Sequence, residues 1–381
     1  MRILLVGEYS GFHNSLKHGL IQLGHEVTII GDGDGFKKFP VDINIGTDYF
    51  SGSWLRQKIR VGWYKLTGQD LADKLKLAHF RESGIHLNHY DIIQFINSNA
   101  FNCQPKVERK MIDLLLENHS KVFLVACGDD YHYTHYLKNE HTGYSIINPE
   151  PERPESRQEH PYTMKYLEKG YKENYDILVK RCDAIIPSHV DFTMALSHES
   201  KATRLIPSAV QTDKFELCQN SNLDTIELFM GINRHNYLKK GIPYFEKALE
   251  KIKRLYGDKV NITIAEDLPY EEYINSYNNA HIFLDQSLSY DQGYNALEAM
   301  AQGKVVFAGA GTAFLKTYGL EKAPLIDAQP DVNYLVQELS RLIDRPQDIL
   351  ELGKSAREFI LKHHDAVNIA RRYEEIYLNI G

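Results

Sequence analysis

The sequence is poor in the features that mark secreted, membrane-spanning and nucleic-acid-binding proteins. Its four cysteines, Cys103, Cys127, Cys182 and Cys218, include no Cys-x-x-Cys pair, which suits a reducing cytoplasm and argues against a disulfide scaffold or a zinc site. No run of about eighteen apolar residues occurs, so no segment is expected to span a membrane. The net charge of −7 gives no general attraction to nucleic acid. An anionic ligand therefore requires a local basic cluster.

What the sequence does contain is enough material for two cores. A length of 381 residues exceeds one ordinary domain, and 43% hydrophobic and 25% charged residues are typical of a globular protein. The start, MRILLVGEYSG, has no signal-peptide cleavage site and predicts a strand over 2–7. A helix over 14–23 and a strand over 25–30 complete a βαβ opening, which predicts a parallel sheet. Further strands are expected at 91–96, 122–127 and 184–187.

The second half repeats this alternation from about Thr225, so the fold class is α/β with two Rossmann-like domains. The helical tail runs from 332 to 380. Between 128 and 161 the pattern stops, and four prolines indicate a long loop or insertion. The expected strands of this half are 226–232, 260–266, 281–287 and 304–311, and the helices between them are 242–256, 270–279 and 294–303.

The most informative stretch is 287–311, SLSYDQGYNALEAMAQGKVVFAGAG, in which a strand leads through a glycine loop into a helix. Gly293 allows a ligand to approach the backbone closely, and the start of the helix offers unpaired N–H groups to phosphate oxygens. Glu298 lies one turn beyond Tyr294 on the same helix face, where a carboxylate can accept hydrogen bonds from ribose hydroxyls. The structural alternative is an ordinary strand–loop–helix unit with Glu298 in solvent.

A second cluster, GINRHNYLKKG over 231–241, also follows a strand and precedes a helix. Arg234, Lys239 and Lys240 place positive charge where a diphosphate would lie. The alternative is a basic loop on the surface. Both clusters fall at the carboxyl ends of strands, where open α/β sheets bind their ligands, and this shared position favours a binding site.

Six segments, in the family's order, resemble glycosyltransferase family 4, a large group of retaining GT-B enzymes. LEAMAQGKVVFAG resembles the family signature, and GINRHNYLKKG resembles its Arg…Lys-Gly diphosphate clamp. RCDAIIPSHVDF and RLIPSAVQTDKF resemble the strand and the interdomain segment that precede them. The first βαβ unit has a glycine loop at Gly11, and the ending RRYEEIYLNI fits the C-terminal helix that returns to the N-terminal domain.

The resemblance implies a GT-B fold, in which two Rossmann-like domains with parallel sheets face each other across a cleft. Residues 1–214 with 365–381 would form the acceptor domain, and residues 215–364 would form the domain that binds the nucleotide-sugar donor. No cofactor is expected, because the nucleotide sugar is a substrate, and no metal ion is expected either.

The same resemblance assigns roles to single residues. Glu298 would bind the donor ribose, while Arg234 and either Lys239 or Lys240 would stabilise the diphosphate leaving group. Asp130 would lie near the reacting sugar. The residues whose backbone would approach the donor are Gly11, Gly293 and Tyr294.

Two positions depart from the family pattern. A glutamate that contacts the transferred sugar usually lies eight positions before Glu298, where this chain has Tyr290 with Asp291 beside it. Either Asp291 substitutes for that glutamate or the contact is lost. The histidine that often ends the fourth strand is replaced by Cys127, with Asp130 retained, and a thiol cannot replace an imidazole as a hydrogen-bond donor.

The implied function is transfer of a sugar, with retention at the anomeric carbon, from a nucleotide-diphosphate sugar to a glycan or lipid-linked acceptor. A cytoplasmic enzyme of bacterial surface polysaccharide or glycoconjugate synthesis is expected. Two alternatives stay open: a non-catalytic, nucleotide-sugar-binding partner subunit, and a GT-B sugar-nucleotide epimerase. An NAD-dependent Rossmann enzyme fits less well, because GEYSGFHN does not match Gly-x-Gly-x-x-Gly.

Two groups of polar residues imitate metal sites. Asp32-Gly-Asp34 has the form of an Asp-x-Asp motif, but its place in a glycine-rich turn after the second strand predicts a plain turn. His132, His135 and His141 lack the spacing of a zinc site. They are interpreted as part of a polar loop or as the rim of an acceptor pocket.

The segment 53–66, SWLRQKIRVGWYKL, predicts a basic amphipathic helix without an acidic residue. Leu55, Ile59, Trp63 and Leu66 share one face. Two interpretations stay open: this stripe packs on the N-terminal domain, or the helix docks at the inner membrane face near a lipid-linked acceptor. The basic residues that flank the stripe are Arg56, Lys58, Arg60 and Lys65.

Overall fold

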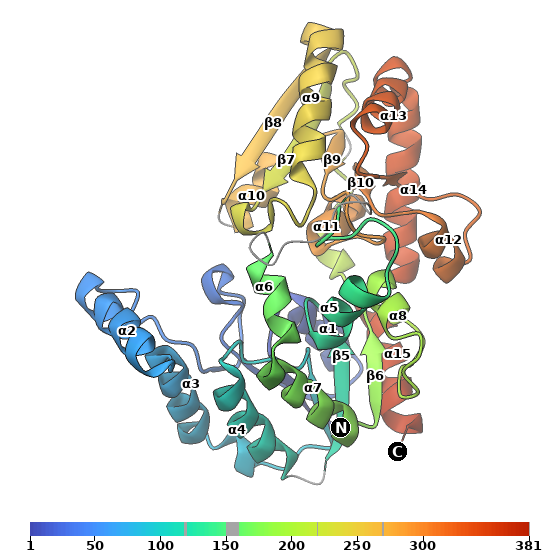
Figure 1. Cartoon of the computed structure of the whole chain (residues 1–381). Coiled ribbons are helices and arrows are strands. Elements are labelled where there is room, and N and C mark those ends of the chain that lie inside the picture. The colour runs from blue at the N-terminus through green and yellow to red at the C-terminus, as the bar shows by residue number, and fades with distance from the viewer. Residues whose placement is uncertain (118–119, 150–159, 219, 269, 381) are drawn as a thin grey trace.

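Two parallel β-sheets organise the chain, one in each half (Figure 1). The computed structural model describes residues 1–117, 120–149, 160–218, 220–268 and 270–380. Every pairing between neighbouring strands in both sheets is parallel. The α/β class and the two-part organisation expected from the sequence are confirmed.

The first sheet and its helices form what we call the N-terminal unit. Its strands are β1 (Arg2–Val6), β2 (Glu26–Gly31), β3 (Ile43–Asn44), β4 (Ile92–Phe95), β5 (Lys121–Ala126) and β6 (Ala184–Pro187). Their order is β3-β2-β1-β4-β5-β6, so the direction of winding reverses between β1 and β4. Open sheets bind ligands beyond the carboxyl ends of the strands at such a switch point. The helices are α1 (Phe12–Gln22), α2 (Trp54–Thr67), α3 (Leu71–Glu82), α4 (Pro105–Leu116), α5 (Tyr131–Asn139), α6 (Pro161–Met164), α7 (Lys169–Arg181), α8 (Val190–Ala195) and α15 (Ala366–Asn379).

The second sheet and its helices form the C-terminal unit. Its strands are β7 (Ile226–Ile232), β8 (Val260–Glu266), β9 (Ile282–Leu284), β10 (Val305–Ala308) and β11 (Ile326–Asp327). They lie in the order β11-β10-β9-β7-β8, with a second switch point between β7 and β9. The helices are α9 (Ile242–Tyr256), α10 (Tyr270–Ser276), α11 (Tyr294–Ala301), α12 (Thr312–Tyr318), α13 (Val332–Asp344) and α14 (Gln347–His363).

Strand β7 shows why a central strand of this half is mostly apolar. Leu228 and Met230 belong to the core that includes α9 and α13, while Phe229 belongs to the core that includes α11 and α14. Alternate side chains of a strand point to opposite faces, and helices cover both faces of this sheet. Apolar side chains are therefore favoured at every position of the strand.

The predicted loop over 128–161 is wrong in part, because α5 lies within it. Asp130 begins this helix: its carboxylate accepts a hydrogen bond from the Tyr131 N–H at 2.7 Å. A capping aspartate before an amphipathic run is a recognisable helix start. The prolines at 151 and 154 lie outside the described residues.

The predicted basic helix is confirmed as α2, but the interpretation in which its stripe packs on the domain is wrong. None of its residues is buried, and the helix projects from the N-terminal unit (Figure 1). Among the described residues, no helix has the length and apolarity needed to cross a membrane.

The C-terminal helix α15 returns to the N-terminal unit, as expected, so both chain ends lie in that unit (Figure 1). Tyr373 and Tyr377 are fully buried in its core. The outgoing and returning segments run side by side where they cross: Val210 N–H donates to the His364 carbonyl at 2.7 Å, and Ala366 N–H donates to the Val210 carbonyl at 2.9 Å. Gly19 of α1 lets α15 approach at this point.

Replacement of Gly19 by alanine is expected to loosen α15. A Cβ atom at Gly19 would lie 2.1 Å from the Ala366 carbonyl oxygen and 2.8 Å from the Ala370 Cβ. Such overpacking typically costs about 1–3 kcal/mol of unfolding free energy, measurable by urea denaturation. Gly62→Ala is the matched control, because nothing lies within 4 Å of its added methyl and it is also in a helix. Equal stability of the two variants would contradict close α1–α15 packing.

Candidate functional site

A cavity of about 520 Å³ lies between the two units at the carboxyl ends of both sheets. It brings together Gly11 from the β1–α1 loop with Tyr294 and Glu298 from α11, as the sequence predicted. The residues that also line it are Ser10, Asn14, Ser15, Lys37, Lys38, Phe39, Pro40, Val210, Gln211, Lys214, Phe215 and Glu272. Three lysines and two glutamates therefore give the cavity wall charges of both signs, and Lys37 and Lys38 are paired with Asp34 and Asp48.

The N-terminal wall of this cavity is made of backbone held in the left-handed region. Gly11, the residue before α1, has φ +84°, and a Cβ there would lie 3.2 Å from the Phe39 ring. Ser10, Asp34 and Lys38 also have positive φ values of 54°, 61° and 51°. Conformations that non-glycine residues rarely adopt concentrate at functional sites, where surrounding contacts fix them. Here Asp34 accepts from the Ser10 N–H at 2.9 Å.

The C-terminal wall is the first part of α11. The Tyr294 hydroxyl donates to the Ala209 carbonyl at 3.0 Å, and its ring meets Phe12 edge-on at 6.5 Å. These contacts fix α11 against the interdomain connector and α1. Glu298, one turn further, is partly exposed and faces the same cavity. A carboxylate in this place can accept hydrogen bonds from the hydroxyl groups of a ligand.

The three predicted phosphate-binding cations do not line the cavity; each is paired with a carboxylate. Arg234 makes a bidentate pair with Glu266 at the ends of β7 and β8. The Lys240 ammonium lies 2.6 Å from Asp285, which follows β9 and is 2% exposed. The second Asp285 oxygen has no hydrogen-bond partner in the described part of the chain and faces the backbone of Gly293, at 3.2 Å from an added Cβ.

Lys239 forms its pair across the two units. Its ammonium lies 2.5 Å from Asp129, and the Thr163 hydroxyl donates to the other Asp129 oxygen at 2.6 Å. Burial opposes the ionisation of Asp129, but the Lys239 charge and these hydrogen bonds outweigh it and hold the pKa of Asp129 below its usual range. The pair therefore links the β7–α9 loop to the β5–α5 loop as an ionised contact.

The loop before α11 also holds the units together. The Asp291 carboxylate accepts from the Val190 N–H at 2.8 Å, and Asp191 accepts from the Ser289 hydroxyl at 2.9 Å. His189 lies 2.8 Å from Asp191. Burial lowers the pKa of His189, but the Asp291 and Asp191 charges outweigh it and raise that pKa to about 9. A protonated histidine between two buried carboxylates thus forms the centre of this joint.

Tyr290 also belongs to the joint. Its ring stacks on Tyr144 at 4.8 Å, and its hydroxyl donates to the Tyr144 carbonyl at 2.9 Å. His141 lies 3.2 Å from the same hydroxyl. Asp291 beside it is 3% exposed and uses both oxygens within the protein. The geometry of both residues is that of an interdomain contact, and neither lines the cavity.

Asp130 and Cys127 lie below the cleft surface. Asp130 is 1% exposed and accepts from the Ser98 N–H at 2.8 Å and from the Ser98 hydroxyl at 2.5 Å. Burial raises its pKa to about 6 despite these hydrogen bonds. Burial also raises the pKa of the Cys127 thiol to about 12. In this geometry Asp130 shapes the β5–α5 loop and offers no free carboxylate oxygen to a substrate.

The sequence reasoning missed Glu8 and the cavity lysines. Glu8 follows β1 directly, is 1% exposed, and accepts from the backbone and side-chain N–H groups of Asn14 at 2.8 and 2.6 Å. Burial raises the pKa of Glu8 to about 7. The signal for Glu8 was its position just beyond the carboxyl end of β1, and Lys37 and Lys38 lie in the loop between β2 and β3.

The two groups that imitate metal sites are engaged in ion pairs and ring stacking. Asp32 pairs with Lys76 at 2.6 Å and Asp34 pairs with Lys37 at 2.6 Å. No group of His, Cys, Asp and Glu in the described residues has the arrangement of a metal site. His132 is buried in α5 and stacks on Tyr175 at 5.5 Å.

Replacement of His132 by phenylalanine is expected to reduce acid sensitivity. Both ring nitrogens of His132 lack a partner among the described residues, and burial lowers its pKa from 6.5 to about 3. The stability that depends on the neutral ring is complete above pH 6.5 and is lost as the pH falls toward 3. Relative to the wild type, the variant should gain about 2 kcal/mol between pH 7 and 5, measured by urea unfolding. If the unfolding free energies of the variant and the wild type changed equally with pH, the prediction would be refuted. Replacement of the exposed His89 by phenylalanine is the control and should leave the pH dependence of stability unchanged.

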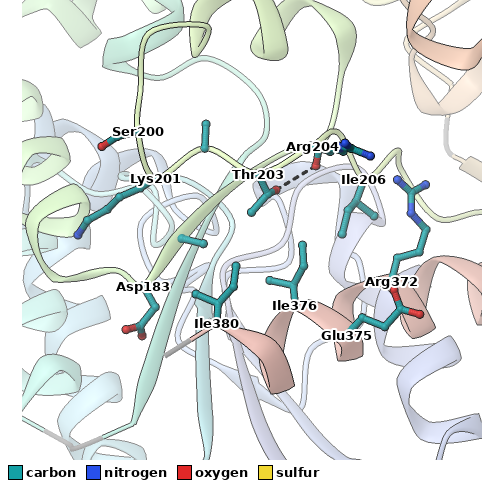
Figure 2. Close-up of a pocket in the computed structure, with 12 residues that line it drawn as sticks. Asp183, Ser200, Lys201, Thr203, Arg204, Ile206, Arg372, Glu375, Ile376 and Ile380 are labelled. Atoms are coloured by element: carbon teal, nitrogen blue, oxygen red, sulfur yellow. Dashed lines mark hydrogen bonds between the residues drawn. The ribbon is translucent and has the colours of Figure 1, made fainter.

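A second cavity, of about 610 Å³, lies at the outer edge of the N-terminal sheet, between β6, the segment 200–206 and α15 (Figure 2). Its cations serve the fold: Lys201 donates to the Cys182 carbonyl at 2.7 Å, and Arg372 donates to the Leu205 carbonyl at 2.5 Å. Lys201 and Arg372 lie at opposite sides of the view (Figure 2). None of the predicted site residues lines this cavity, and Asp183 places it at the amino end of β6.

Comparisons with known proteins agree with this fold. Residues 239–375 match the model of a family described as glycosyl transferase-like. No curated protein matches the chain.

Several solved structures share the whole architecture. A sucrose-phosphate synthase from Thermosynechococcus elongatus superposes with a TM-score of 0.61 at 16% identity, over 99% of this chain and 98% of that one. HepE from Anabaena, in complex with UDP and glucose, superposes with a TM-score of 0.57 at 13% identity, over 100% of this chain and 99% of that one. MnaA from S. aureus, solved with UDP, superposes with a TM-score of 0.54 at 12% identity, over 99% of this chain and 96% of that one. These similarities establish the GT-B fold.

Proposed function

We propose that the chain is a retaining glycosyltransferase of family 4 that takes its sugar from a nucleotide-diphosphate donor. The observation that carries the proposal is the convergence of Gly11, Tyr294 and Glu298 on one cavity between the units. These residues come from opposite ends of the chain, and the resemblance assigned each of them to the donor. The glycosyl transferase-like match over 239–375 covers α11 and its neighbours, and HepE and MnaA with UDP are relatives in fold.

In this proposal Glu298 binds the ribose and cations stabilise the diphosphate as it leaves. Arg234 and Lys239 would exchange their carboxylates for phosphate oxygens. Arg234 and Glu266 are about half exposed, at 51% and 44%, so their pair contributes little and is easily replaced. Lys240 is expected to keep the buried Asp285 and to act as a fixed charge, because separating them would strand a buried carboxylate.

The finer parts of the proposal concern the acceptor and the setting. The acceptor is a glycan or a lipid-linked saccharide in bacterial surface polysaccharide or glycoconjugate synthesis, and the anomeric configuration is retained. The enzyme works in the cytoplasm, which agrees with four unpaired cysteines, and contacts the inner face of the membrane. The donor is a substrate, so the reaction needs no cofactor.

A non-catalytic subunit that binds nucleotide sugar is the second candidate. Tyr290 and Asp291 favour it, because both are engaged between the units where the family has a sugar-contacting glutamate. Turnover of a radiolabelled nucleotide sugar, with NMR assignment of the product anomer, separates the two candidates. Binding without turnover would support the subunit, and inversion would overturn the retaining mechanism.

Comparison of a nucleoside with its diphosphate tests the assigned roles. Thermal shift with uridine, adenosine, guanosine and their diphosphates should identify one base, with about 2.7 kcal/mol of stabilisation at a hundredfold excess over Kd. Glu298→Ala should weaken nucleoside and diphosphate alike, because both contain the ribose. Arg234→Ala should weaken only the diphosphate, by about tenfold or more, because a charge-assisted pair is lost. Absence of any shift would remove the donor site from the proposal.

Matched controls come from the same unit. Glu321→Ala and Arg254→Ala remove exposed charges outside the cavity and should leave both ligands unaffected. Glu266→Gln provides the opposite test, because it releases Arg234 from its carboxylate. The diphosphate should then bind more tightly while the nucleoside is unchanged, and weaker diphosphate binding would contradict the exchange of partners.

A further inference from the structure

Helix α2 exposes a continuous apolar stripe. Leu55, Ile59, Trp63 and Leu66 are 59%, 55%, 40% and 87% exposed, and they follow one another along one side of the helix. Apolar side chains scattered singly on a surface need no explanation, but a contiguous stripe marks an interaction surface. The remaining large apolar side chains of the helix, Trp54, Val61 and Tyr64, are also exposed.

The charges beside this stripe are all positive. Lys58 and Lys65 lie along one border and Arg56 and Arg60 along the other, while residues 49–69 contain no acidic side chain. This contrasts with the net charge of −7 for the whole chain. Arg60 alone is neutralised within the protein, by a bidentate pair with Asp70 at 2.6–2.7 Å. The partner of this surface is therefore both apolar and anionic.

The helix is already formed and is held at few points. Gly68, with φ +68°, ends it, and Arg60 and Trp63 tie it to α3, the latter with the Lys74 ammonium 5.1 Å from its ring centre. Lys58 lies 3.9 Å from the centre of the Trp54 ring. A preformed amphipathic helix loses little conformational entropy when its partner binds.

We propose that α2 docks on the surface of an anionic lipid bilayer, with the Leu55–Ile59–Trp63–Leu66 stripe in the interfacial region and the lysines and arginines on lipid headgroups. Its 14 residues and four basic side chains are those of a helix that lies in the interface plane, not of one that spans the bilayer. Tryptophan and tyrosine favour this boundary, and each basic residue near an anionic surface strengthens binding about fivefold.

The same surface is connected to the candidate site. Lys38 lines the cavity and pairs with Asp48 at 3.6 Å, and the next residue, Tyr49, has the Arg56 guanidinium 4.4 Å from its ring centre. These contacts join α2 to the rim of the cavity in the N-terminal unit. The docking proposal deepens the proposed function and rests on it only for the identity of the acceptor. A saccharide on a lipid carrier in the same bilayer would reach the cleft across this rim.

The chain contains its own reporter, because its two tryptophans, Trp54 and Trp63, both lie in α2. Tryptophan emission of the full chain should shift to the blue with phosphatidylcholine vesicles that contain phosphatidylglycerol, and the protein should float with them. Pure phosphatidylcholine should bind it much less, and raising salt from about 50 to about 500 mM should weaken binding to the anionic vesicles. No spectral shift and no flotation with anionic vesicles would overturn the proposal.

Variants separate the apolar and charged contributions. Leu55→Ser with Ile59→Ser should abolish flotation, and Arg56→Gln with Lys58→Gln should weaken it roughly 30-fold. Leu87→Ser with Leu255→Ser, which are 79% and 65% exposed elsewhere, is the control and should float like the wild type. A blue shift that grows with protein concentration in the absence of lipid would instead assign the stripe to a second copy of the chain and overturn lipid docking.

The outcomes distinguish this inference from the proposed function. Vesicle binding without any nucleotide-induced thermal shift would keep the docking surface and remove the transferase proposal. A thermal shift with a nucleotide, in a protein that does not bind anionic vesicles, would keep the transferase proposal and remove the docking surface.

Discussion

The side-by-side crossing of the chain between the two units is the constraint on which the rest of the structure depends. Val210 exchanges backbone hydrogen bonds with His364 and Ala366, so the outgoing and returning segments form one short double connection. The following helix α15 then buries Tyr373 and Tyr377 in the N-terminal core. A double connection restrains the units more than a single linker would, and it keeps the carboxyl ends of both sheets toward each other.

Because the two edges face each other, charged side chains of the loops that follow the strands pair with one another. These loops contain many charged side chains, and oppositely charged ones lie together. Lys239 pairs with Asp129 across the units, and His189 lies between Asp191 and Asp291. The first pair is partly exposed, at 31% for Lys239 and 13% for Asp129, whereas Asp191 and Asp291 are buried beside His189. Both contacts hold loops of the two units together.

The sequence predicted the sheet elements well because their signals are local. IELFMGI, VNITIAE and the helix at Ile242–Tyr256 lie where they were expected. Strand β7 is a mostly buried apolar run, the edge strand β8 is largely exposed but contains several β-branched residues, and the helix is amphipathic. Helix α5 was missed because its histidines and tyrosines resemble a polar loop, and only the Asp130 cap marks its start. The exposure of α2 was undecided, because an amphipathic stripe looks the same whether it meets a core or another partner.

Among the candidate site residues, the sequence suggested neighbours in the cavity only where backbone geometry decides their positions. Gly11, Tyr294 and Glu298 meet at one cavity because strand ends and helix starts fix their positions. The partners of Arg234, Lys239 and Lys240 were not predictable, since long side chains select carboxylates from loops far away in sequence, such as Asp129 and Asp285.

Helix α2 is stabilised by few contacts with the rest of the N-terminal unit. A helix of 14 residues with no buried side chain is marginal in water, because nucleation is costly and most helical stability in proteins comes from packing. The Arg60–Asp70 pair and the Gly68 cap restrain only its last turns, which leaves Trp54 and Leu55 at the outer end without a core contact. An apolar, anionic surface would supply the missing burial to that end. The N-terminal unit is therefore a sheet with covering helices, from which α2 projects without a buried side chain.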